Sequence, residues 1–106
     1  MGSSSQDWQV NYPEEIIDAR ITTFKPDSYD VKHPINVTII RRGSEYIASQ
    51  LESNIHASGD DEVEALDNLK SLILDIFESL TLEPEENLGP KPLRQLAVLR
   101  EWIERA

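Results

Sequence analysis

Apolar and polar residues alternate between positions 35 and 39, which is the two-residue period of a β-strand. Gly43 and Ser44 follow, and they suit a two-residue hairpin turn with glycine at its first central position. Such a turn pairs Ile40 with Ile47 and returns the chain as a second, antiparallel strand. One face of the predicted hairpin then carries the residues that we expect in the core: Ile35, Val37, Ile39, Tyr46 and Ala48.

The second face of the predicted hairpin is also partly apolar. Ile40, Ile47 and Leu51 share it with short polar side chains. A sheet face that meets water is normally polar, so this patch predicts a cover. The candidates for this cover are the N-terminal segment, the last helix, a partner protein and a second copy of the chain. Together with an amphipathic last helix, the patch predicts self-association.

A second pattern, with the 3.6-residue period of an α-helix, runs from Asp61 to residue 80. Asp61 and Glu64 have the spacing of a capping box, with Asp in the place of Ser or Thr. Apolar residues occur at positions 65, 66, 69, 72, 73, 76, 77 and 80. Those expected to be buried against the sheet are Leu66, Leu69, Ile73, Ile76 and Leu80. Those on the opposite, polar face are Glu64, Asp67, Ser71, Asp75 and Glu78. Pro84 ends the predicted helix.

Weaker patterns complete the predicted fold. Residues 16–24 are rich in β-branched side chains and predict another strand, whereas Pro, Asp and Ser mark residues 26–34 as a loop. A short strand is expected at residues 54–58, and Pro92 suits the first turn of a last helix, residues 93–105. The predicted class is α+β: a small antiparallel sheet of three to four strands, one long helix packed on a face, and a C-terminal helix. The predicted organisation is a flexible N-terminal segment (1–15), an α+β domain (16–83), a Pro/Gly linker (84–92) and the C-terminal helix (93–106).

The charge of the chain is concentrated on the predicted long helix and the turn after it. The 106 residues carry a formal net charge of −10. Residues 60–86 hold ten acids and one base, a local charge of −9. Such a surface disfavours nucleic acid and anionic membranes, which need clustered Lys and Arg, and it fits a basic protein partner. The candidates for steering that partner are Asp67, Asp75 and Glu78.

The sequence contains no recognisable catalytic, metal-binding or cofactor-binding motif. It has no Cys and two histidines, His33 and His56, which together make no metal motif. Glu62, Glu64 and Asp67 fit the cap and surface of one helix better than a two-metal site. We therefore expect no enzyme activity and no cofactor. The chain also lacks an apolar run of 18 residues and a signal-peptide pattern, so the expected location is the cytoplasm.

Residues 46–70 resemble the HicB antitoxin family. In that family a strand with an aromatic residue, Val and Ala is followed by a Gly-Asp-Thr segment, and then by Glu-Ala and Asn on a helix. The matching residues of this chain are Gly59, Asp60, Glu64, Ala65 and Asn68, and the resemblance extends over residues 35–80. It implies a partial ribonuclease H-like fold, with a helix on one face of an antiparallel sheet. It also implies neutralisation of a small basic toxin that cleaves messenger RNA.

Three differences separate this chain from the family pattern. Asp61 stands where Thr is usual, and residues 50–52 stand where the family often has a turn that contains Pro. The roughly 25 residues after the long helix are too few for a helix-turn-helix domain. We therefore expect no direct binding to nucleic acid.

These observations support two functional hypotheses. The first is a HicB-like antitoxin module that binds and occludes a small basic toxin. The alternative is a stand-alone HicB-like regulatory or assembly protein that works as a homo-oligomer without a toxin. A ribonuclease H-like nuclease is disfavoured, because the acids lie on a helix and do not converge from strands. The candidate partner-binding residues are Asp67, Asp75, Glu78, Ile40, Ile47 and Leu51.

Overall fold

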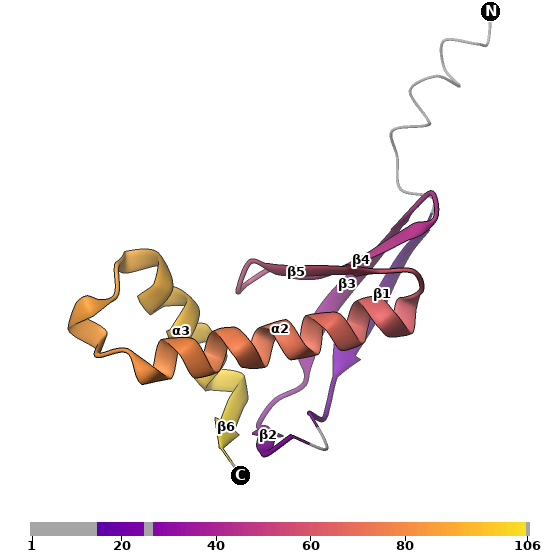
Figure 1. Ribbon diagram of the computed structural model, residues 1–106. Coiled ribbons are helices and arrows are strands. Elements are labelled where there is room, and N and C mark those ends of the chain that lie inside the picture. Colours follow the sequence, from indigo (N-terminus) through magenta and orange to yellow (C-terminus); the bar gives the residue numbers. More distant parts are fainter. Residues whose placement is uncertain (1–14, 25–26, 106) are drawn as a thin grey trace, which may run out of the picture.

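The computed structural model describes residues 15–24 and 27–105, so the predicted N-terminal segment lies outside the described residues except for Glu15. The fold is α+β, as predicted (Figure 1). In chain order the elements are β1 (Glu15–Ile21), β2 (Tyr29–Val31), β3 (Ile35–Arg42), β4 (Glu45–Gln50), β5 (Ile55–Gly59), α2 (Glu62–Leu82), the short 3-10 helix η1 (Glu85–Asn87), α3 (Pro90–Trp102) and β6 (Ile103–Arg105).

The main sheet has four antiparallel strands in the order β1-β3-β4-β5. The predicted hairpin is confirmed in its register, with Ile40 paired to Ile47. Gly43, at the first central position of its turn, has a φ of 61°, where a residue with a Cβ would be crowded. The strand predicted at residues 16–24 corresponds to β1, which ends earlier than expected, at Ile21. The short third strand is β5, which begins one residue later than expected.

Helix α2 packs along one face of this sheet and extends past it toward α3 (Figure 1). It begins as predicted: Asp61 is the N-cap, and its Oδ1 accepts a hydrogen bond from the Glu64 N–H at 2.8 Å. Glu64 Oε1 in turn accepts from the Asp60 N–H at 2.7 Å, one residue before the position used in a standard capping box. The helix ends at Leu82, shortly before Pro84.

The buried stripe of α2 differs in part from the predicted one. Leu69 and Ile73 are fully buried, as expected. Three residues that were predicted to be buried are only partly so: Leu66, Ile76 and Leu80. Leu72, within the predicted stripe, is 36% exposed, whereas Leu74, outside it, is 5% exposed. The predicted stripe assumed that α2 packs only against the main sheet. The second half of α2 is also covered from another side.

That other side is formed by a two-stranded sheet that the sequence did not indicate. β2 lies within the predicted loop at 26–34 and pairs antiparallel with β6. The prediction of a last helix over 93–105 was therefore wrong at its end, since α3 stops at Trp102 and the next three residues form β6. Helix α3 also begins earlier than predicted, at Pro90. The local sequence could not predict β2 and β6, because each of these strands forms only by pairing with a segment far away in the sequence.

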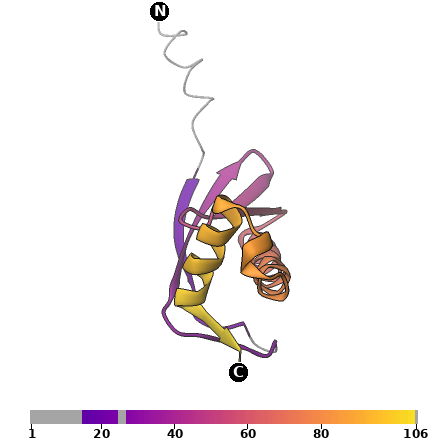
Figure 2. The same cartoon turned by 90° about the vertical axis from the view of Figure 1, so that its left-hand side faces the viewer.

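Helix α3 shares one hydrophobic core with the sheet and α2. Leu96 and Leu99 are buried in that core, and Figure 2, in which α2 is seen nearly end-on, shows α3 beside it. Gln95 Nε2 also donates a hydrogen bond to the Ser53 carbonyl at 2.8 Å, in the turn between β4 and β5. The last helix is thus packed on its own domain, and its apolar side no longer argues for self-association.

A buried polar network fixes the same turn. Gln50 is fully buried, and its Oε1 accepts hydrogen bonds from the Ser53 N–H and Oγ–H, each at 2.8 Å. Its Nε2 donates to the Asn36 carbonyl at 3.0 Å and to Glu52 Oε1 at 2.8 Å. Both ends of the Gln50 amide are therefore satisfied, as a buried polar group requires. The network joins β3, β4 and the turn that receives α3.

Candidate interaction surface

The polar face of α2 is exposed, as predicted, over Glu64, Asp67, Ser71, Asp75 and Glu78. The acids at the start of the helix have structural roles, because Asp61 and Glu64 both bind backbone N–H groups. Farther along, the carboxylates of Asp67, Asp75 and Glu78 form no hydrogen bond or ion pair with any residue that the structure describes. These three carboxylates are therefore available to a binding partner.

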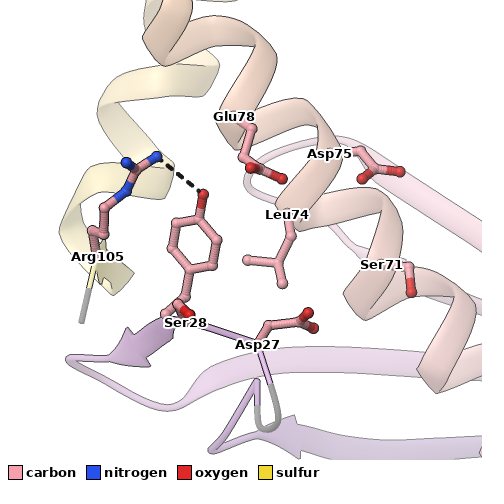
Figure 3. A pocket seen from close by; sticks show the side chains of 8 residues that line it. Asp27, Ser28, Ser71, Leu74, Asp75, Glu78 and Arg105 are labelled. Carbon is pink, nitrogen blue, oxygen red and sulfur yellow. Dashed lines mark hydrogen bonds between the residues drawn. The ribbon is translucent and has the colours of Figure 1, made fainter.

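Two of these acids line a hollow between α2 and the segment that leads into β2 (Figure 3). Its volume is about 490 Å³. The residues that line it are Asp27, Ser28, Tyr29, Ser71, Leu74, Asp75, Glu78 and Arg105. Asp75 and Glu78 come from α2, and Asp27 comes from the chain across the hollow. The sequence did not single out Asp27, because the local pattern of a loop does not show which helix the loop faces.

Arg105 is the one basic residue in the described lining of this acidic hollow, and unlike the acids it is held by a neighbouring side chain. Arg105 Nη2 lies 3.5 Å from the Tyr29 hydroxyl oxygen, to which it donates, and the guanidinium carbon lies 5.9 Å from the centre of the tyrosine ring. Tyr29 in turn packs edge-on against Phe77, with 5.9 Å between ring centres. Arg105 therefore rests on an anchored tyrosine, and it forms no ion pair with another described residue. Three acidic residues and one basic residue line the hollow, which leaves it negative.

The described residues do not support a metal site. Across positions 15–24 and 27–105, no group of three or more His, Cys, Asp or Glu side chains is placed to hold a metal ion. Both ring nitrogens of His56 are hydrogen-bonded, one to Ser49 Oγ of β4 at 2.8 Å and the other to Asn54 Oδ1 of the preceding turn at 3.0 Å. Among the described helices, none is both long and apolar enough to cross a membrane.

The residues that carry the HicB resemblance lie at the junction between β5 and α2. Gly59 packs directly against the helix, because a Cβ at this position would collide with the backbone of Ala65. Asn68 Nδ2 donates to the Ser58 carbonyl at 2.8 Å and so ties the helix back to β5. The side chain of Glu64 completes the N-terminal cap. The motif therefore specifies how the helix meets the sheet, and it does not by itself mark a surface that contacts a toxin.

Two of the three residues of the predicted apolar patch, Ile40 and Ile47, lie on the sheet face that α2 leaves uncovered, whereas the third, Leu51, does not. Ile40 and Ile47 are half-buried cross-strand neighbours there. The register adds Ile16 of β1, which stands opposite Ile40 and is 64% exposed. Leu51 lies in the turn after β4, beyond the paired strands, and is 67% exposed. The sequence missed Ile16 because the pairing of β1 with β3 leaves no local pattern.

The six predicted partner-binding residues therefore do not form one surface. The three acids lie on the outer side of α2, whereas Ile40 and Ile47 lie on the far face of the sheet, with the core in between. The molecule presents two separate surfaces: the acidic hollow, and an isoleucine row made of Ile16, Ile40 and Ile47.

Comparison of the chain with protein-family models, with curated proteins and with solved structures finds no match. The HicB resemblance thus rests on the strand–helix motif alone, and the two surfaces are the physical basis for a functional proposal.

Proposed function

We propose that this chain binds a basic protein partner through the acidic hollow and the outer face of α2, and that it acts in the cytoplasm as a HicB-like antitoxin. The observation that carries the proposal is that Asp27, Asp75 and Glu78 line one hollow, in which the one basic residue of the described lining, Arg105, rests on Tyr29. Exposed, unpaired carboxylates of this kind attract a cationic partner and reject anionic ones.

The hollow suits a long basic side chain. Leu74 and Tyr29 contribute a small apolar part of its lining, and three acidic residues line it as well. A partner Lys or Arg can lay its alkyl stem on this apolar part while its charged end meets carboxylate oxygens. Such contacts set association rate and specificity more than affinity, so further contacts along α2 would have to supply the remaining binding energy.

The particular function, neutralisation of a toxin by occlusion, comes from the resemblance. Support for it is the strand–helix motif together with an antiparallel sheet that carries a helix on one face. A small toxin that cleaves messenger RNA must itself be basic to hold phosphates, and the negative charge of α2 complements such a surface.

Neutralisation can be measured by growth. The chain is co-expressed with the small basic protein encoded by a neighbouring reading frame, under conditions in which that protein alone stops growth. We expect the parent chain to restore growth and the variant Asp75→Lys/Glu78→Lys to lose most of this protection. The matched control is Glu83→Lys/Glu86→Lys, which changes the charge equally at exposed acids outside the hollow.

Equal protection by the parent and both variants would rule out the hollow as the contact surface. A neighbouring basic protein that does not impair growth, or the absence of such a reading frame, would rule out the antitoxin function. Circular dichroism of each purified variant checks that the fold is kept.

The isoleucine row favours a second candidate, a stand-alone homo-oligomer without a toxin. Three isoleucines from three neighbouring strands lie side by side on the sheet face opposite α2, and one of them is largely exposed. Continuous apolar surface on an open sheet face is typical of an interaction site. Sedimentation of the pure protein tests whether this oligomer forms, and the growth assay with the neighbouring reading frame separates this candidate from the first one.

A further inference from the structure

Among the described residues, the outer edge of β1 is an unpaired edge of the main sheet. β1 is the first strand in the order β1-β3-β4-β5, and within the described part of the chain no strand pairs with its other side. It is seven residues long. An edge strand of this length presents a row of backbone N–H and C=O groups that can pair with another strand. The opposite edge, β5, has five residues and is packed against the first turn of α2.

The residues of β1 are complementary to a second, antiparallel copy of the same strand. When two copies are aligned about Ala19, Asp18 of each stands directly opposite Arg20 of the other. Both side chains are exposed, lie on the sheet face that α2 leaves uncovered, and form no ion pair with a described residue. Directly opposed side chains of antiparallel strands have Cβ atoms about 4.5–5.5 Å apart, which is a suitable distance for an ion pair.

The same alignment matches the apolar side of β1. Ile17 of one copy stands opposite Ile21 of the other, on the face that packs against the core. Ile17 is half-buried in the single chain, so this contact would remove apolar surface from water. Alignment about Asp18 or about Arg20 would instead place two like charges opposite each other, which is unfavourable. The charges therefore select one register.

We propose that the chain forms a two-fold symmetric dimer by antiparallel pairing of β1 with β1 of a second copy, centred on Ala19. The two sheets would then form one continuous sheet, with the α2 helices of both copies on the same side. The dimer deepens the second candidate function, to which it gives an interface. It leaves the acidic hollow free, so binding of a basic partner through α2 does not depend on it.

Sedimentation equilibrium of the full chain tests this dimer. Pairing of one seven-residue edge falls at the small end of specific interfaces, so we expect a concentration-dependent dimer with a Kd on the order of 1–100 μM. The variant Arg20→Asp places Asp18 opposite an acid twice in each dimer and should raise the Kd by about tenfold or more. The swapped variant Asp18→Arg/Arg20→Asp restores both opposite-charge pairs, and its Kd should return to within about threefold of the parent value.

The matched control is Arg94→Asp, the same substitution at an exposed position on α3, which should leave the Kd unchanged. A chain that stays monomeric at millimolar concentration overturns the dimer. So does a swapped variant that dimerises no better than Arg20→Asp. A dimer that is insensitive to Arg20→Asp but lost in Ile40→Thr/Ile47→Thr would place the contact on the isoleucine row and would also reject pairing through β1. Neither result would bear on the acidic hollow, which the growth assay tests separately.

Discussion

Gly59 and Ala65 are in direct contact where β5 meets α2: the Cα of Gly59 lies against the backbone of Ala65, with no room for a Cβ between them. Ala65 is fully buried, so the helix cannot move outward without exposing core. Glycine at position 59 therefore sets the distance between the helix and the edge of the sheet.

Gly59→Ala should destabilise the protein by about 1–3 kcal/mol, because the added methyl overlaps helix backbone that has no free direction in which to move. Chemical denaturation monitored by circular dichroism measures the change. Gly89→Ala is the matched control, since a Cβ there would meet only Pro92 Cδ at 3.9 Å. Gly89 is the N-cap of α3, where Ala is less favourable than Gly, so the control should cost no more than about 0.5–1 kcal/mol. Equal stability of the two variants would contradict the close contact.

Leu69→Ala should cost roughly 2–4 kcal/mol, because Leu69 is fully buried between α2 and the sheet and its loss leaves a cavity. For a domain of this size that corresponds to a drop in Tm of about 4–8 °C for each kcal/mol. Leu82→Ala, at the exposed end of the same helix, should leave the Tm nearly unchanged. An unchanged Tm for Leu69→Ala would mean that the helix packs through another face.

Gln50→Ala should destabilise the protein by about 1–3 kcal/mol, because it leaves the buried Ser53 N–H without its acceptor and leaves the Ser53 hydroxyl only the longer contact, at 3.4 Å, to the carbonyl of residue 50. Hydrogen exchange should show faster exchange in the turn between β4 and β5 and in α3, which Gln95 ties to that turn. Glu52→Ala removes one exposed acceptor of the same network and should have little effect. Faster exchange throughout the sheet, with none specific to the turn, would argue against this local role.

Association with a basic partner should slow when Asp67, Asp75 and Glu78 are replaced together by Asn, Asn and Gln. Exposed charges act mainly on association rate and are screened over about 8–10 Å at physiological salt. At low salt we expect about tenfold slower association and a flatter salt dependence, with the Tm retained. Stopped-flow binding to the neighbouring basic protein provides the measurement. The control replaces Glu83, Glu86 and Glu101 by Gln, an equal change of charge at other exposed positions. Identical rates and salt slopes for both triple variants would show that the acidic face only keeps the protein solvated.

Much of the main sheet and its helix follows from local pattern. The strand period at 35–39, the turn at Gly43 and the cap at Asp61 each act through neighbours in the chain, and each is found where it was predicted. The outer face of α2 was predictable for the same reason, because helical spacing alone puts Asp67 and Asp75 on one side.

The candidate sites were less predictable. Asp27 joins the acidic hollow, and Ile16 joins the isoleucine row, through contacts between segments that are far apart in the sequence. The same holds for Leu74, which is buried because β2, β6 and α3 cover the second half of α2. A single sequence carries the period of each element but not which elements become neighbours.

The sequence by itself determined the hairpin, the long helix with its capped start, the α+β class and the negative charge of the helix face, because these depend on residue spacing within one segment. Only the tertiary structure decided that α3 ends at Trp102 and gives way to β6, that the acids and the isoleucines lie on opposite sides of the core, and that β1 is an edge strand of the described sheet. These features depend on strand pairing and burial between distant segments, whose free energy appears only when the segments meet.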